Sequence, residues 1–480
     1  MVVEAATAAG SGSPLAVGAG AGDMSVHSYR LSTVVPGSVT GEAVDYELTD
    51  ADLLHKLHYL RAVHVFRAPA PGGGAAALTI RELKEPMFPW LDLYFPVSGR
   101  LRRLEAPAGA GEGESDAKAA AAGGRPYVRC NDCGVRIVEA ECDATVDEWL
   151  EAEAERGGQC KVLAYDKVIG PELFFSPLLY VQVTTFKCGG MALGFTWAHV
   201  IGDIPSAAAC FTTWAQLFSG NKAPAPTLRD PLATPPPSAA APAGATAAPP
   251  PSVKPTAAPV GDHWVVPTTR DMVPFSFHVT EQQLKGLHQL GAPAGGHRQV
   301  GTFELVAAVV WRALAAIRGA DEEAATRTVT VVKATDPAVV LGGGRLGLTN
   351  EHRIGHVVAT GGSSPAAADV AKLAALLAGA RLDGAAAVAA VALAGAAGDA
   401  DLVVYGANLT FVDAEGLDVY GLELGSWRPA HVEYAVDGVG DGGAVIVHRD
   451  GGRGRTVVAV VRRGEAERLH GALRDALRAA

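Results

Sequence analysis

Basic residues are scarce in this chain. It has 40 Lys and Arg against 51 Asp and Glu, which gives a formal net charge of −11. Proteins that bind nucleic acids need clustered Lys and Arg to neutralise phosphates, and no such cluster occurs along the sequence. The charge balance therefore argues against a nucleic acid as a partner.

Cysteine is scarce too, with six in 480 residues, far below the density of small disulfide-stapled secreted domains. Cys130 and Cys133 have the spacing of half a zinc or redox site, but no second pair follows. His352 and His356 lie four residues apart, and the sequence assigns no third ligand to them. We therefore predict reduced thiols, no metal site and no bound cofactor.

Long apolar runs are missing as well. No stretch of about 18 apolar residues is free of charged residues and turn formers, so we predict no membrane span. The Ala-rich segment 384–398 is expected to be a helix of a water-soluble protein. Residues 1–23 are rich in Ala and Gly and hold no Lys or Arg, so we expect neither a secretory signal nor a transit peptide there. We predict a disordered tail over 1–23 and a protein that faces the cytosol.

Proline is concentrated in residues 223–262, together with many alanines. Because proline lacks the amide donor and clashes inside a helix, this stretch is predicted to be a linker. It separates two halves of similar length, 24–222 and 263–480, which fits the two or three domains expected for this chain length. An Ala/Gly-rich stretch at 104–124 is predicted to be a surface loop.

Strand and helix patterns alternate in both halves. Strand patterns occupy Tyr59–Arg67, Leu179–Phe186, Met191–Trp197, Val273–Val279, Thr328–Val332, Leu402–Val412, Ala444–Val447 and Thr456–Val461. Helical patterns occupy Arg81–Leu93 (with breaks at Pro86 and Pro89), Ser206–Phe218, Thr302–Ile317 and Glu465–Leu477. This alternation predicts an α/β or mixed α+β fold.

The most informative pattern surrounds His199. A predicted hairpin ends at Trp197 and a helical pattern begins at Ser206, so His199 and Asp203 are placed on a loop between rigid elements. A neutral imidazole with a pKa near ~6.5 can take the proton from an alcohol or amine that attacks a thioester, which accelerates acyl transfer by about 10²–10⁴-fold. Asp203 would orient the ring or brace the loop, and Gly202 would allow a tight bend.

Four segments of the sequence, in the same order, resemble the BAHD acyltransferases. They are Trp90–Leu101 (WLDLYFPVSGRL), Cys130–Ala140 (CNDCGVRIVEA), Trp197–Asp203 (WAHVIGD) and Thr302–Arg312 (TFELVAAVVWR). The resemblance covers most of the chain outside the tail and the Ala/Pro stretches. It implies two similar chloramphenicol-acetyltransferase-like domains around an interdomain channel, acyl-CoA as a co-substrate, and His199 and Asp203 as the catalytic pair.

The chain also departs from that family. Ile204 stands where the family's HxxxDG motif has its Gly. The late DFGWG-type motif is reduced to Glu423–Pro429 (ELGSWRP), and the strand that should carry an Arg partner for Asp203 reads Val332–Asp336 (VKATD). The late segment is expected to help shape the channel or brace the fold through Glu423, Gly425, Trp427 and Arg428.

These departures resemble one group of the family, the eceriferum/glossy proteins of plants. The similar segments are Val34–Gly41, Leu54–Tyr59, Asn408–Phe411 and Val436–Asp441. This resemblance implies work with a fatty acid elongase condensing enzyme at the endoplasmic reticulum, extending very-long-chain acyl groups for cuticular wax.

Two functions stay open at this point. The first is an elongase partner that binds a long acyl chain, with turnover undecided because the late motif is degraded. The second is a soluble transferase that moves an acyl group from CoA to an alcohol or amine, with His199 as general base. A monomer is expected in both cases.

Overall fold

The computed structural model describes residues 24–41, 44–69, 78–103, 124–228, 249–290, 300–334, 347–360, 364–382, 384–397 and 400–478. The predicted tail over 1–23, almost all of the predicted loop at 104–124, and residues 229–248 of the predicted linker lie outside these ranges.

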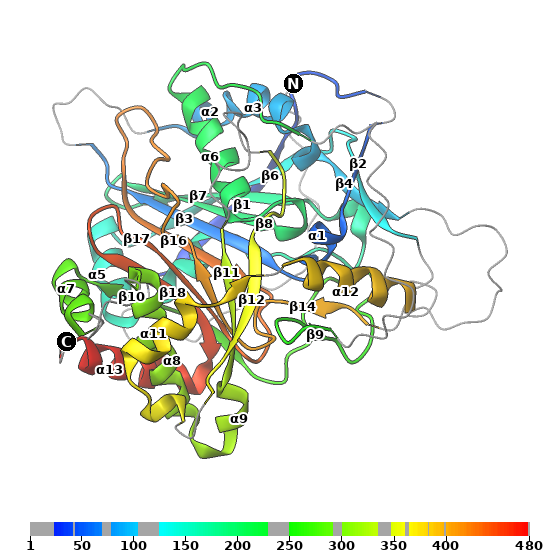
Figure 1. Cartoon of the computed structure of the whole chain (residues 1–480). Coiled ribbons are helices and arrows are strands. Elements are labelled where there is room, and N and C mark those ends of the chain that lie inside the picture. Colours follow the sequence, from blue (N-terminus) through cyan, green and yellow to red (C-terminus); the bar gives the residue numbers. More distant parts are fainter. Residues whose placement is uncertain are drawn as a thin grey trace.

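Two large sheets form the centre of the molecule (Figure 1). In spatial order, the first holds β1 (Val26–Val34), β6 (Val135–Cys142), β7 (Leu179–Phe186), β8 (Met191–Ala198), β3 (Tyr59–Phe66) and β16 (Pro429–Asp437). The second holds β10 (Met272–Val279), β18 (Arg455–Arg462), β17 (Ala444–Arg449), β15 (Leu409–Asp413), β11 (Thr328–Lys333), β12 (Arg353–Val358) and β13 (Arg381–Leu382). Smaller sheets pair β2 (Asp45–Glu47), β5 (Pro126–Arg129) and β4 (Arg100–Arg103), and β9 (Lys254–Pro255) with β14 (Leu402–Val403).

Helices cover these sheets, which confirms the mixed α/β prediction. They are α1 (Asp50–Leu53), α2 (Ile80–Lys84), α3 (Met87–Leu93), α5 (Val146–Arg156), α6 (Ile204–Phe218), α7 (Glu281–Leu290), α8 (Thr302–Arg318), α9 (Glu323–Thr326), α11 (Val370–Ala378), α12 (Gly384–Ala397) and α13 (Arg463–Arg478). Helices α8, α11 and α13 gather beside the second sheet and share a core with it (Figure 1). Helices α3 and α6 contribute to a larger core that draws on both halves of the chain.

Local sequence signals explain where several helices begin. Thr49, Thr79 and Thr145 each cap a helix, and in each case an acidic side chain three residues on closes a capping box. Pro86 separates α2 from α3, as predicted. Pro89 lies within the first turn of α3, where its missing amide donor breaks no helical hydrogen bond.

Strand β16 joins the first sheet although it belongs to the second half of the chain. It pairs antiparallel with β3 from Tyr59↔Asp437 to Phe66↔Pro429. The strand patterns of the sequence did not include this segment. The first sheet is therefore completed by the second half, and a division of the chain into 24–222 and 263–480 remains a prediction.

The described end of the predicted linker is packed against the second half. Residues Lys254–Pro255 form β9, and the Thr256 amide donates to the Asp401 carbonyl at 2.8 Å. Ser252 and Val253 are buried. Residues 249–262 are thus part of the folded body rather than a free spacer.

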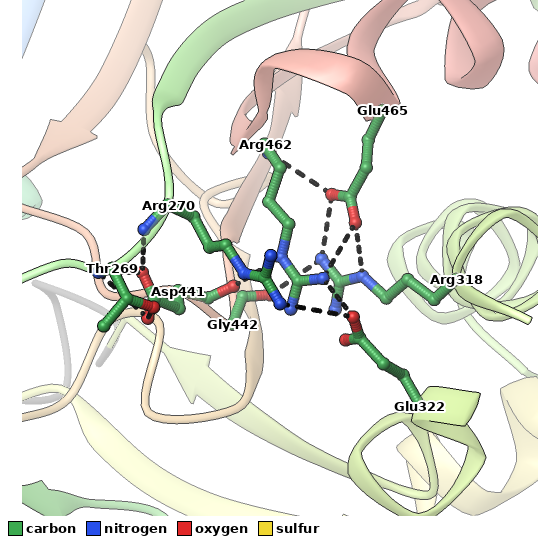
Figure 2. A network of polar contacts seen from close by, with 8 residues as sticks. All are labelled: Thr269, Arg270, Arg318, Glu322, Asp441, Gly442, Arg462 and Glu465. Atoms are coloured by element: carbon green, nitrogen blue, oxygen red, sulfur yellow. Dashed lines mark hydrogen bonds and ion pairs between the residues drawn. The ribbon is translucent and has the colours of Figure 1, made fainter.

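A buried ion-pair network connects α8 to the start of α13 (Figure 2). The Arg318 guanidinium donates to both Glu465 carboxylate oxygens, at 2.8 and 3.0 Å. Arg462 lies between Glu465 and Glu322 and donates through Nε to the Asp441 carbonyl at 3.2 Å. The Asp441 carboxylate in turn accepts hydrogen bonds from the backbone ahead of β10. The eceriferum-like segment that ends at Asp441 therefore has a structural role.

None of the helices in the described ranges is long and apolar enough to cross a membrane.

Candidate active site

His199 lies where the sequence predicted, between β8 and α6. Strand β8 ends at Ala198, a short 3-10 turn covers His199–Ile201, and α6 begins at Ile204. The His199 amide donates to the His58 carbonyl at 3.1 Å, which fixes the turn against the start of β3. The His199 side chain is 0% exposed, so it is enclosed at the junction of the two halves.

Asp203 braces this loop instead of contacting His199. Its Oδ1 accepts from the Ser206 amide at 3.1 Å and so caps α6, and its Oδ2 accepts from the Glu351 amide at 3.0 Å. His352 Nδ1 lies 3.7 Å from the same oxygen. Burial by itself would raise the pKa of Asp203, but His352 and the two amides outweigh it and lower the pKa. Of the two expected roles, the geometry favours bracing.

Replacing Asp203 with Ala is expected to lower the free energy of unfolding by about 2–4 kcal/mol. The cap would be lost, and the Glu351 amide would lose the acceptor that the buried Asp203 carboxylate provides. Asp203→Asn keeps an acceptor for the cap and should cost about half as much. Urea unfolding measures both. Asp369→Ala, which removes an exposed N-cap from α11, is the matched control at about 1 kcal/mol. Equal losses for Asp203→Ala and Asp369→Ala would contradict the bracing role.

The basic group near Asp203 is His352, not the strand residue that replaces the family's Arg. Lys333 pairs with Glu304 and lies 3.6 Å from Asp413, so its charge is used within the second half. His352 was predicted only as one of a pair with His356. The structure separates that pair, since His356 is exposed on β12 while the His352 side chain is buried beside Asp203.

Aromatic and imidazole rings from both halves surround His199. The His55 ring stacks on it with centroids 4.5 Å apart, and the Tyr405 hydroxyl lies 3.0 Å from its Nε2. His352 meets the same ring edge-on at 5.5 Å. The sequence analysis did not select His55 or Tyr405. The one available signal was the repeated His in Leu54–Tyr59, within an eceriferum-like segment.

Burial keeps the His199 ring neutral. Desolvation, followed by the nearby His352 and His58, holds the pKa of His199 well below its usual value. A neutral imidazole is what a general base requires. Its Nδ1 has no hydrogen-bond partner within the described part of the chain. Because the side chain is enclosed, an acceptor would need an opening to reach this nitrogen.

Gly202 is required by close packing. A Cβ atom at this position would lie 2.8 Å from Ser206 Cβ and 3.4 Å from the Trp197 ring. The Gly202 carbonyl also accepts the Trp197 indole hydrogen at 2.9 Å. This glycine therefore lets the loop lie against the first turn of α6.

The late motif lies at the opposite end of α6. The Gly425 amide donates to the Ser219 hydroxyl at 3.2 Å, just past the last residue of the helix. Trp427 is buried, whereas Glu423 and Arg428 form an exposed ion pair. Since α6 has 15 residues, about 22 Å separates this segment from Asp203. The structure thus brings His199, Gly202 and Asp203 together and leaves the late motif apart from them.

Comparisons with known proteins agree with this architecture. The family model described as "Transferase family" matches residues 24–335. Protein ECERIFERUM 26-like from Arabidopsis thaliana is 36% identical over 427 residues, covering 88% of this chain and 89% of that protein. Protein ECERIFERUM 2 from the same plant is 34% identical over 427 residues, covering 88% of this chain and 91% of that protein.

Two solved structures share the fold at low sequence identity. Vinorine synthase superposes with a TM-score of 0.62 at 16% identity, covering 93% of this chain and 96% of that one. F. graminearum TRI101 complexed with coenzyme A and deoxynivalenol gives 0.62 at 14% identity, covering 90% and 97%. By its sequence matches and by its fold, the chain belongs to the Transferase family, the BAHD acyltransferases, and is similar to its ECERIFERUM members.

Proposed function

We propose that this protein promotes very-long-chain fatty acyl elongation for cuticular wax, by binding a long acyl chain or acyl-CoA and acting with an elongase condensing enzyme at the endoplasmic reticulum. The observation that carries the proposal is the enclosure of His199. Its side chain is 0% exposed, its Nε2 is hydrogen-bonded to Tyr405, and its motif partner Asp203 serves as a brace. A motif used for structure instead of turnover has this arrangement.

The relatives support the same proposal. Similarity to the ECERIFERUM proteins extends over 88% of the chain. Binding an acyl chain needs apolar contact alone, worth ~0.8 kcal/mol for each buried CH₂. Such binding tolerates the loss of the late DFGWG-type motif, whereas fast catalysis would tolerate it less.

A second candidate function is acyl transfer from CoA to an alcohol or amine. The observation in its favour is the neutral imidazole of His199, which has one nitrogen without a hydrogen-bond partner in the described ranges. TRI101, which shares the fold, is solved with coenzyme A. In this function His199 is the general base, and the protein must open around it so that the acceptor alcohol or amine can reach its ring.

Expression in yeast together with a plant condensing enzyme, followed by acyl-chain profiling, separates the two functions. We expect His199→Ala to retain most of the chain elongation, because chain binding does not need the base. His356→Gln, on an exposed position of β12, is the control, and immunoblots correct for protein level. In parallel, purified protein is assayed for acyl transfer. If the second function holds, His199→Ala should lower the rate of acyl transfer by about 10²-fold or more.

Normal protein levels with no elongation in His199→Ala would refute the elongase-partner proposal. A bulky residue at Gly202 is not a usable block of the acyl path, because its Cβ would collide with Ser206. Loss of elongation in such a variant would report misfolding.

A further inference from the structure

The hydroxyl of Tyr405 lies within the distance at which a base takes a proton from an acyl acceptor. That distance is about 2.6–3.2 Å between the two heavy atoms, and the Tyr405 oxygen is 3.0 Å from His199 Nε2. Nε2 is the ring nitrogen farther from the backbone, and it faces the second half of the chain, to which Tyr405 belongs. An acceptor alcohol and the Tyr405 hydroxyl cannot both hold this position.

Imidazole rings surround the buried side chain of Tyr405. The His58 ring meets it edge-on with centroids 4.9 Å apart, and the His199 ring lies at 5.5 Å. The rings of His55 and His352 lie at 6.0 and 6.4 Å. The Tyr405 side chain is only 1% exposed. It therefore fills a slot with walls of flat rings, and the space it takes up is that of one phenol molecule.

The backbone around Tyr405 is fastened to its surroundings. The Val404 amide donates to His58 Nε2 at 3.1 Å, and the Tyr405 carbonyl accepts from the Gly440 amide at 2.9 Å. The Tyr405 side chain can leave the slot only if these contacts break and the turn between β14 and β15 rearranges. Tyr405 thus fills the slot as a fixed part of the fold.

The Tyr405 hydroxyl is also in the protonation state of an acceptor alcohol. Burial, followed by the negative charge of Asp203, raises the pKa of Tyr405, so the phenol keeps its proton at neutral pH. The neighbouring His199 ring is neutral, because burial holds the pKa of His199 low. A neutral hydroxyl beside a neutral imidazole is the pair that general-base catalysis of acyl transfer begins from.

We propose that Tyr405 occupies the acceptor position of an acyl-transfer site, and that the slot binds a phenol as acyl acceptor once this side chain is shortened. The proposal rests on His199 as the base of the second candidate function. In the reaction, the phenol oxygen bonds to the thioester carbonyl carbon and the C–S bond of acyl-CoA breaks. His199 passes the phenol proton to the CoA thiolate. While Tyr405 is in place the chain can bind an acyl group without transferring it through Nε2, which agrees with the elongase-partner proposal.

The test uses full-length wild type and Tyr405→Ala, each incubated with palmitoyl-CoA and phenol. Replacement by Ala removes the atoms of one phenol molecule, and buried cavities of this kind bind small aromatic ligands. Mass spectrometry measures phenyl palmitate, which Tyr405→Ala should form about 10²-fold or more faster than the wild type. The double variant Tyr405→Ala/His199→Ala should lose this gain. Phenol should also raise the melting temperature of Tyr405→Ala but not that of the wild type.

Three further variants separate the occupied position from other effects. Tyr405→Phe removes the hydroxyl but keeps the slot filled, so it should form far less ester than Tyr405→Ala. Tyr434→Ala opens a buried cavity on β16, where the ring meets His64 and His448 instead, and should form no ester. If Tyr405→Ala does not fold, Tyr405→Leu keeps more of the packing. A water molecule should then take the place of the hydroxyl and hydrolyse palmitoyl-CoA in a reaction that needs His199.

The proposal fails if folded Tyr405→Ala makes no ester, whether or not it binds phenol. It also fails if the wild type transfers acyl groups to alcohols as fast as Tyr405→Ala, because His199 would then act through Nδ1. Equal ester formation in Tyr405→Phe would show that the hydrogen bond matters and the filled slot does not. Chain elongation in yeast is scored separately with the wild type, so this proposal and the elongase-partner proposal can fail independently.

Discussion

On acidification from pH 7 to pH 5, the share of two buried histidines, His64 on β3 and His448 on β17, in the loss of free energy of unfolding should be about 4 kcal/mol. Burial, with the nearby His448 and His431, lowers the pKa of His64 to about 3. Burial lowers the pKa of His448 to about 4, although a hydrogen bond to the Arg449 carbonyl partly opposes it. In the unfolded chain both rings take up a proton near pH 6.5. Below this pH, each histidine therefore lowers the free energy of unfolding by about 1.4 kcal/mol per pH unit. The loss ends when the pH reaches the pKa of that histidine in the folded protein.

Urea unfolding between pH 8 and pH 5 measures this dependence. His64→Leu should reduce the slope of the free energy of unfolding against pH by the contribution of one histidine. At pH 8 the same change should lower the free energy of unfolding only slightly, because neither ring nitrogen of His64 has a partner in the described structure. His431 acts in the opposite direction, since Glu433 raises the pKa of His431 in spite of burial. Exposed His356 provides the control, as His356→Gln should leave the slope unchanged. A slope equal to that of the wild type in His64→Leu would contradict the assignment.

Glu465→Ala should lower the free energy of unfolding by about 3–5 kcal/mol, the second large effect. Glu465 is the carboxylate that Arg318 and Arg462 share (Figure 2). The side chains of Arg318 and Glu465 are only 4% and 7% exposed, so removing the carboxylate leaves a buried guanidinium without its counter-charge.

The double variant Arg318→Met/Glu465→Leu should be less damaging than Glu465→Ala, because no unpaired charge remains. Arg463→Ala, which removes an exposed pair with Asp271, is the surface control and should cost less than about 1 kcal/mol. Chemical denaturation at neutral pH measures all of these. A loss of under about 1 kcal/mol in Glu465→Ala would show that water replaces the carboxylate.

The sequence predicted features that depend on near neighbours. The hairpin of β7 and β8 and the break at Pro86 follow from patterns a few residues long. The position of His199 between a strand and a helix is of the same kind. The order of four family motifs then extended the prediction from local elements to the fold.

Contacts between distant segments could not be predicted in this way. Tyr405 is 206 residues from His199, and its place depends on a break in the predicted strand Leu402–Val412. That prediction was wrong in extent, because β14 ends at Val403 and β15 begins at Leu409. The turn between them holds Gly406 with φ +85°, where a Cβ atom would lie 2.4 Å from the Gly440 backbone. This backbone contact exists only in the folded chain.

The placement of β16 limits how the molecule can move. If the two halves swung apart on a hinge, the ladder from Tyr59↔Asp437 to Phe66↔Pro429 would have to break along its whole length. Hinge closure around a ligand, which many two-lobed proteins use, needs flexible connections at a few residues only. Under the proposed function, a long acyl chain should therefore enter and leave while the two sheets remain joined. The chain length that the protein accepts would then not be set by the degree of closure between the two sheets.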